Sequence, residues 1–143
     1  MDKESTQAAN LLGAIAESNY KLSCFADHLR KTADPAEISL DFECSRNSNY
    51  FDYGTGSPYL FNWYIDARFR SGRSLAVIID LFWTDQKWFV DSRVETSGDN
   101  APIPLISLPE HEAASIAEFI EVLELVTTEI LDGAKHLIQE KDN

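Results

Sequence analysis

From Thr6 to Lys31 the apolar side chains recur with the period of an α-helix. The spacing places them along one stripe of a helix over residues 6–31, and Ser18 fills the missing step with a small side chain. Asp34-Pro35 ends this helix, because the residue before a proline avoids the helical conformation. The stripe consists of Leu11, Ile15, Leu22, Phe25 and Leu29.

The middle of the chain follows the two-residue period of β-strands. Apolar and polar side chains alternate over residues 37–45, 59–70 and 88–95. The expected strand over residues 74–83 is apolar on both sides from Leu75 to Trp83, except at Asp80. Alternating segments joined by short turns predict an antiparallel meander of four strands. Residues 46–58 are rich in Asn, Ser, Gly and Tyr, so we expect them to form an extended loop.

A second helix is expected over residues 108–139, after a crossing loop that holds at most a fragment of edge strand at 103–106. Ser107-Leu108-Pro109-Glu110 matches a capping box, in which the Ser107 hydroxyl accepts from the amide of Glu110. Gly133 lies inside the helix and weakens it by about 1 kcal/mol relative to alanine. The expected buried stripe consists of Ile116, Ile120, Leu123, Ile130 and Leu137.

These elements predict a single α+β domain over residues 1–143. Each helix has one apolar stripe and the sheet has one fully apolar face. The simplest arrangement packs both helices on that face as a two-layer sandwich. The other sheet face is then left to solvent or to a partner. A chain of 143 residues buries enough surface to fold without a disulfide or a metal.

Net charge narrows the range of partners. Twenty-four acidic residues face twelve basic ones, which gives a net charge of −12. Such a surface repels nucleic acid and anionic lipid, and it speeds encounter with a basic partner. Solubility alone is an equally good reason for the acidity.

The chain has no apolar window long enough for a membrane span and no signal-like apolar segment after its charged start. We therefore expect a cytoplasmic protein. Cys24 and Cys44 fall at apolar positions and are expected to be reduced core residues, although a bridge between them would fit a secreted protein.

Catalytic patterns are missing from the sequence. It contains no nucleophile elbow, zinc-protease helix, phosphate-binding loop or dinucleotide fingerprint. His28, His111 and His136 are far apart on predicted helices, so we expect no metal and no cofactor. The acids Asp66, Asp80 and Asp91 share a sheet face with Arg68, Arg70 and Arg93, which favours ion pairs over an acid–base pair. We expect a protein that is not an enzyme.

Two features instead indicate binding to another protein. Residues 94–134 hold nine acids and no lysine or arginine, and aromatic side chains occupy a polar loop and the sheet face away from the core. A solvated helix face, a loop that folds back and tucks its aromatic rings under a helix, or a homodimer surface would also explain them. The candidate partner-binding residues are Tyr50, Phe51, Asp52, Tyr53, Tyr64, Asp66, Asp80, Phe82, Phe89, Asp91, Glu118, Glu121 and Glu124.

The order helix, antiparallel sheet, helix, with strands FNWYIDARF, LAVIIDLFW and KWFVDSRVE, resembles bacterial immunity proteins of the TriTu type. The resemblance is one of layout and covers about Ile38 to Ile138. It implies a protein that binds a cognate toxin and occludes its active site. The toxins of that family are Rhs-type enzymes that ADP-ribosylate elongation factor Tu, so the implied partner is a basic toxin domain.

Two other classes of function stay open at this point. One is a secretion chaperone of the type III kind, which is also small, acidic and α+β, and which dimerises around an extended effector segment. The other is an enzyme or small-ligand binder with Trp63, Trp83 and Trp88 around a pocket. The assignment of all three tryptophans to the core argues against an enzyme or small-ligand binder of this kind.

Overall fold

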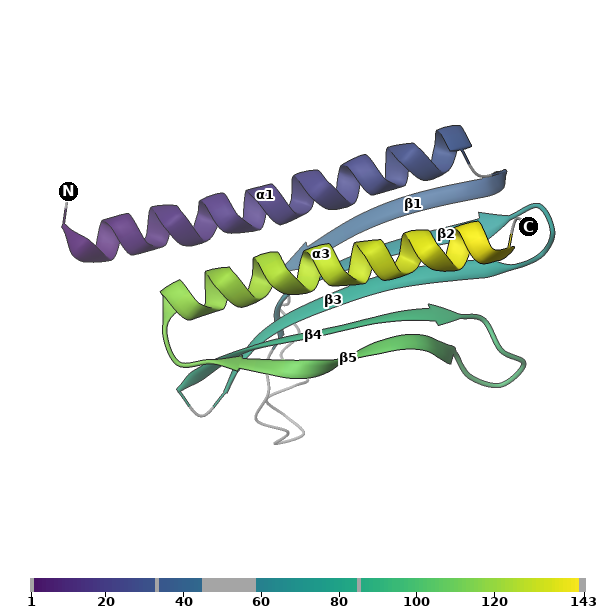
Figure 1. Ribbon diagram of the computed structural model, residues 1–143. Helices are drawn as coiled ribbons and strands as arrows, with labels where there is room; N and C mark the ends of the chain where they lie inside the picture. Colours follow the sequence, from purple (N-terminus) through teal and green to yellow (C-terminus); the bar gives the residue numbers. More distant parts are fainter. Residues whose placement is uncertain (1, 33, 45–58, 85, 142–143) are drawn as a thin grey trace.

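The computed structural model describes residues 2–32, 34–44, 59–84 and 86–141, and it has the α+β architecture that the sequence predicts. Five antiparallel strands form one sheet in the order β1-β2-β3-β4-β5. Both helices cover the same face of this sheet and run side by side in the same direction (Figure 1). The elements are α1 (Lys3–Thr32), β1 (Pro35–Cys44), β2 (Tyr59–Phe69), β3 (Ser74–Thr84), β4 (Lys87–Thr96), β5 (Ile103–Ala113) and α3 (Ile116–Lys141).

The fifth strand corrects the expected helix over residues 108–139. Residues 103–113 form β5, which pairs with β4, and the helix begins only at Ile116. Prolines 104 and 109 cannot donate to a ladder, but an edge strand tolerates them. Two register shifts in this pairing, at Val90/Ser92 and at Val94/Glu95, accommodate the irregular strand.

The helix cap is therefore not at Ser107. The Ser115 hydroxyl accepts from the amide of Glu118 at 3.2 Å, and the Glu118 carboxylate accepts from the amide of Ala114 at 3.0 Å. This is a variant of the capping box, shifted eight residues along the chain, in which the Glu118 carboxylate reaches the amide one residue before the cap and not that of Ser115.

The core lies between the helices and the sheet. In α1 the expected stripe is confirmed, because Ile15, Leu22, Phe25 and Leu29 are buried and Leu11 is half-buried. The small Ser18 meets Thr127 of α3 with a hydroxyl–hydroxyl distance of 3.3 Å. In α3 the buried stripe differs from the expected one, because Ile116, Ile120 and Leu137 are only half-buried. Its buried members are Phe119, Leu123, Val126, Thr127, Ile130, Leu131 and Ala134.

Gly133 has a packing role in this interface. A Cβ at this position would lie 2.7 Å from Cδ1 of Ile106 in β5. An alanine here would gain helix propensity but would have to displace the tip of the Ile106 side chain.

Several side chains depart from their expected places. Cys24 is exposed and not a core residue, while the side chain of Cys44 lies outside the described part of the structure. His111 lies in β5 and not on a helix, and its buried Nδ1 has no hydrogen-bond partner among the described residues. Trp63 is fully buried, but Trp83 is 38% exposed, so its assignment to the core is wrong.

Candidate functional site

The face of the sheet that the helices do not cover, here called the open sheet face, carries most of the candidate residues that the structure describes. The pairing register arranges its side chains in rows across β2, β3 and β4. One row is Asn62, Asp80 and Asp91; the next is Tyr64, Ile78 and Arg93; the third is Asp66, Ala76 and Glu95. Strand alternation alone gathers these side chains on one surface, because every second residue of a strand points to the same side.

Arg93 is the centre of an ion-pair network on this face. Its Nη1 lies 3.1 Å from Oδ2 of Asp80 and 3.7 Å from Oδ2 of Asp91, and its Nε lies 2.5 Å from Oε1 of Glu95. Asn62 also donates to Oδ1 of Asp80. One guanidinium thus faces three carboxylates, and the network keeps an excess of negative charge.

Burial makes the charged groups of this network depend on one another and influences the pKa values of Asp91 and Arg93. The side chain of Asp80 is only 5% exposed, which makes Arg93 and Asn62 necessary partners for its charge. Burial raises the pKa of Asp91, and the nearby Asp80 adds to this, while Arg93 opposes it. Burial alone would lower the pKa of Arg93, but its bonds to Glu95 and Asp80 more than offset this and raise it.

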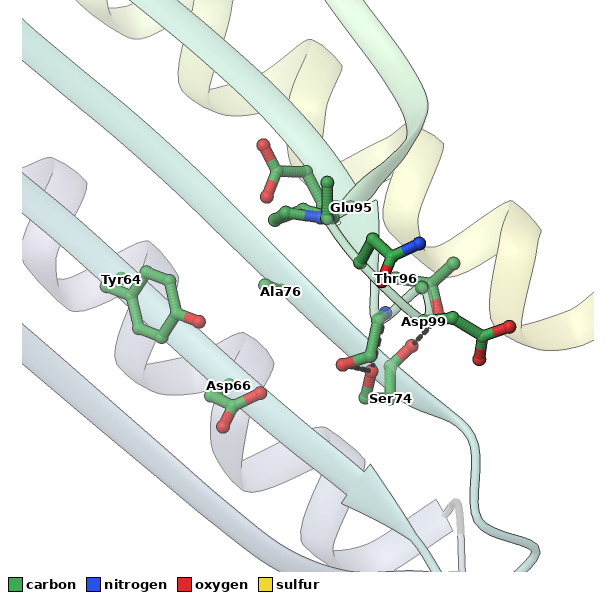
Figure 2. A pocket seen from close by; sticks show the side chains of 12 residues that line it. Tyr64, Asp66, Ser74, Ala76, Glu95, Thr96 and Asp99 are labelled. Carbon is green, nitrogen blue, oxygen red and sulfur yellow. Dashed lines mark hydrogen bonds between the residues drawn. The ribbon is translucent and has the colours of Figure 1, made fainter.

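A hollow of about 310 Å³ lies beside the network, over the third row of side chains (Figure 2). Its floor includes Ala76, a small residue paired with Asp66 on one side and Glu95 on the other. Tyr64 and Ser74 line it from β2 and β3. The loop that follows β4, residues 97–102, closes its other side and includes Asp99. We call this feature the Ala76 hollow.

Hydrogen bonds hold the loop against the sheet. The Ser74 hydroxyl donates to Oγ of Ser97 at 2.7 Å and accepts from the amide of Ser97 at 2.9 Å, while the Thr96 hydroxyl donates to the carbonyl of Ser74 at 2.7 Å. The turn is tight at Gly98, where a Cβ would lie 2.5 Å from the carbonyl oxygen of Ala101. The wall of the hollow is thus built into the fold.

The hollow is electrostatically negative. Burial raises the pKa of the Tyr64 phenol, and the carboxylates of Asp66 and Glu95 raise it further, because a phenolate would be repelled there. This effect outweighs the opposing influence of Arg68.

The candidate residues therefore divide between two surfaces. On the open sheet face lie Tyr64, Asp66, Asp80, Phe82, Phe89 and Asp91, and the rings of Phe82 and Phe89 stack at 5.3 Å. Glu118, Glu121 and Glu124 are exposed on α3, in the helical layer. Glu121 and Glu124 line a groove of about 750 Å³ between α3 and α1. Tyr50, Phe51, Asp52 and Tyr53 lie outside the described residues.

Sequence reasoning missed the roles of Glu95, Ala76 and the loop over residues 97–102. Glu95 was within reach, since the same alternation that selects Asp91 also selects Arg93 and Glu95. No sequence signal marks Ala76 as the floor of a hollow, because that depends on the register of three strands. The structure also pairs Arg70 with Asp34, at 3.3 Å, and not with an acid of the open sheet face.

Across the described ranges, no three His, Cys, Asp or Glu side chains are grouped so that they could hold a metal ion. None of the described helices is long and apolar enough to span a membrane. Comparison of the chain with protein-family models, with curated proteins and with solved structures gives no match.

Proposed function

We propose that this protein is an immunity protein, which binds a basic toxin domain with its open sheet face and covers the toxin's active site. On this proposal it acts in the cytoplasm as a stoichiometric inhibitor and not as an enzyme. The observation that carries the proposal is the surplus of carboxylates held around Arg93 on a face that the helices leave uncovered.

The charge of this region supports a basic partner. The network and the Ala76 hollow together hold five carboxylates and two guanidinium groups, so their formal charge is 2 − 5 = −3. A negative patch raises the association rate with a positive partner and selects against acidic ones. The groups counted are Asp66, Asp80, Asp91, Glu95, Asp99, Arg68 and Arg93.

The size of the open sheet face also suits a protein partner. Strand β2 has 11 residues, which corresponds to about 36 Å, and five strands at about 4.8 Å spacing span roughly 20 Å. The resulting area of about 700 Å² is close to the roughly 800 Å² that each partner contributes to a standard interface. Aromatic rings within a charged surface, here Tyr64, Phe82 and Phe89, are typical of residues that dominate binding energy.

The proposal is tested by co-expressing this protein with the toxin encoded beside its gene. We expect rescue of growth and a one-to-one complex that survives gel filtration. Failure of both would contradict the immunity function. Sedimentation of the protein alone separates this function from a secretion chaperone, which would be a dimer before it meets its cargo.

A matched pair of charge reversals tests which surface binds. Asp91→Lys on the open sheet face should weaken the complex at least tenfold, mostly through slower association at low salt. Glu124→Lys removes the same charge from α3 and should change affinity less than about threefold, because exposed rim charges contribute little. The reverse ranking would move the binding surface to the helical layer.

A further inference from the structure

We propose that the Ala76 hollow is a subsite for one arginine side chain of the partner. The inference rests on the proposed function, since it names the group that a basic partner would insert into the open sheet face. It goes beyond general charge attraction, because it assigns a chemical group to one place.

The geometry of the third row supports a single cation. Asp66, Ala76 and Glu95 are register partners on three adjacent strands. Their backbones therefore place the two acids about 10 Å apart, with only a methyl group between them. A guanidinium is planar and carries donors on separate edges, so it can reach two separated carboxylates, whereas an ammonium has all three of its donors on one nitrogen.

Both acids keep an oxygen available for such a guest. Asp66 meets Arg68 through Oδ2 at 3.3 Å, and Glu95 meets Arg93 through Oε1 at 2.5 Å. Among the described residues, Oδ1 of Asp66 and Oε2 of Glu95 form no ion pair or side-chain hydrogen bond. Asp99 belongs to the loop wall, but its carboxylate points away from Asp66 (Figure 2).

Tyr64 adds an aromatic wall to the carboxylates. Its ring lies next to Asp66 in the close-up view, on the β2 side of the hollow (Figure 2). An arginine side chain stacks on an aromatic ring through its flat face while its edges donate hydrogen bonds. The hollow thus combines a ring, carboxylates and a small floor, and this combination is better suited to arginine than to lysine.

The hollow needs little rearrangement to bind. Its loop wall is fixed by the bonds between Ser74 and Ser97 and by the close approach at Gly98. A site that is already in its binding geometry loses less entropy when the ligand enters. Arginine side chains that enter such prepared pockets are frequent hot spots in protein interfaces.

The ligand class is tested without the toxin, by NMR titration of the protein with N-acetyl-arginine amide. We expect shifts at the amides of Ala76, Glu95 and Gly98 that saturate at millimolar probe. The citrulline analogue has the same shape without the charge, and it should give no saturating shifts. Equal shifts from both probes would overturn the proposal, as would stronger binding of the lysine analogue.

Filling the hollow is the matched test of its location. Ala76→Leu should remove the arginine response, while Ala36→Leu, at an exposed alanine of β1, should leave it intact. Asp66→Asn provides a second variant that keeps the shape of the site and should weaken the response at least threefold. An arginine response that persists in Ala76→Leu, with shifts elsewhere, would contradict the assignment.

The complex with the toxin separates this inference from the proposed function. Ala76→Leu should raise the dissociation rate at least tenfold. If the toxin binds this variant as tightly as it binds the wild type, the subsite is wrong and the immunity function stands. If the hollow binds the arginine probe but the toxin forms no complex, the ligand class is supported and the proposed function fails.

Discussion

The open sheet face and the exposed side of α3 are both acidic, but they hold their charge differently. On the open sheet face the carboxylates of Asp80, Asp91 and Glu95 converge on Arg93, and Asp80 is almost fully buried. On α3 the carboxylates of Glu121 and Glu124 are exposed to water. The number of acids in a segment therefore says less about function than the environment in which each acid is placed.

The difference has an electrostatic consequence. Salt and water screen exposed charges within about 8–10 Å, whereas partly buried charges are screened much less. The open sheet face therefore presents a fixed negative field, while the field of α3 depends on the surrounding ions. A fixed field is better suited to steering and orienting one specific partner.

Removal of Arg93 should show the largest difference between the two layers. Arg93→Ala leaves the buried Asp80 without its cation, and we expect unfolding free energy to fall by about 2–3 kcal/mol. The effect lies below that of a fully buried pair, because the side chain of Arg93 is 35% exposed. Urea or guanidinium titration measures it.

The matched control in the helical layer is Arg30→Ala. Arg30 pairs with Asp27 at 2.7 Å, with both side chains about half exposed, so its loss should cost less than about 0.5 kcal/mol. The double variant Arg93→Ala, Asp80→Asn should recover part of the stability, since it removes the unpaired buried charge. Equal losses of unfolding free energy for Arg93→Ala and Arg30→Ala would mean that the ion pairs of the open sheet face contribute no more to stability than an exposed ion pair of α1.

The cap of α3 offers a test of intermediate size. Ser115→Ala should lower the unfolding free energy by about 1 kcal/mol, because it removes the acceptor for the amide of Glu118. Ser107→Ala, at the cap expected from sequence, should have almost no effect, since Ser107 is exposed in β5. Thermal melts of the two variants compare them directly.

The acids of α3 also differ in their environment, because Glu118 accepts a hydrogen bond at the helix start and Glu124 is exposed to water. Glu118→Gln weakens a charge-assisted bond to the amide of Ala114 and removes a negative charge from the helix start, so a loss of about 0.5 kcal/mol is expected. Glu124→Gln should change stability by no more than a few tenths of a kcal/mol, or raise it slightly by relieving repulsion with Glu121. A larger loss for Glu124→Gln would show that it has a structural role as well.

Local periodicity predicted most of the fold. The apolar stripe of α1, including Ser18, was predicted, and α1 and the first four strands begin and end within about three residues of their expected bounds. The failure at β5 has a physical cause, because Pro104 and Pro109 are local signals for loops and helix starts. Only pairing with β4, a tertiary interaction, makes residues 103–113 a strand.

The candidate site could also be predicted only in part: the shared face of its residues was predictable, and the hollow was not. A two-residue period placed Tyr64, Asp66, Asp80 and Asp91 on one face without any knowledge of strand order. The Ala76 hollow was not predictable, since it needs the register of three strands and the path of a loop held by Ser74 and Gly98. Neither the register of the strands nor the path of the loop can be predicted from the spacing of residues within one segment.

The effect expected at Asp91 is small, but its sign distinguishes the open sheet face from an ordinary solvated surface. Burial and the neighbouring Asp80 raise the pKa of Asp91 above its ordinary value of 3.8, so the folded protein holds this proton more tightly than the unfolded chain. The stabilisation from that proton is present at acid pH. It is lost as pH rises from 3.8 through the raised pKa, and at neutral pH the charged carboxylate opposes folding.

Asp91→Asn should therefore stabilise the protein at pH 7, by no more than about 0.5 kcal/mol, because the side chain is 37% exposed and solvent screens the repulsion. The gain should shrink as the pH is lowered toward 3.8, and urea titrations at several pH values measure it. A loss of stability at pH 7 would mean that attraction to Arg93 outweighs burial at this position. The acids of the open sheet face would then serve to stabilise the fold through ion pairs, and their presence would no longer support the binding of a basic partner.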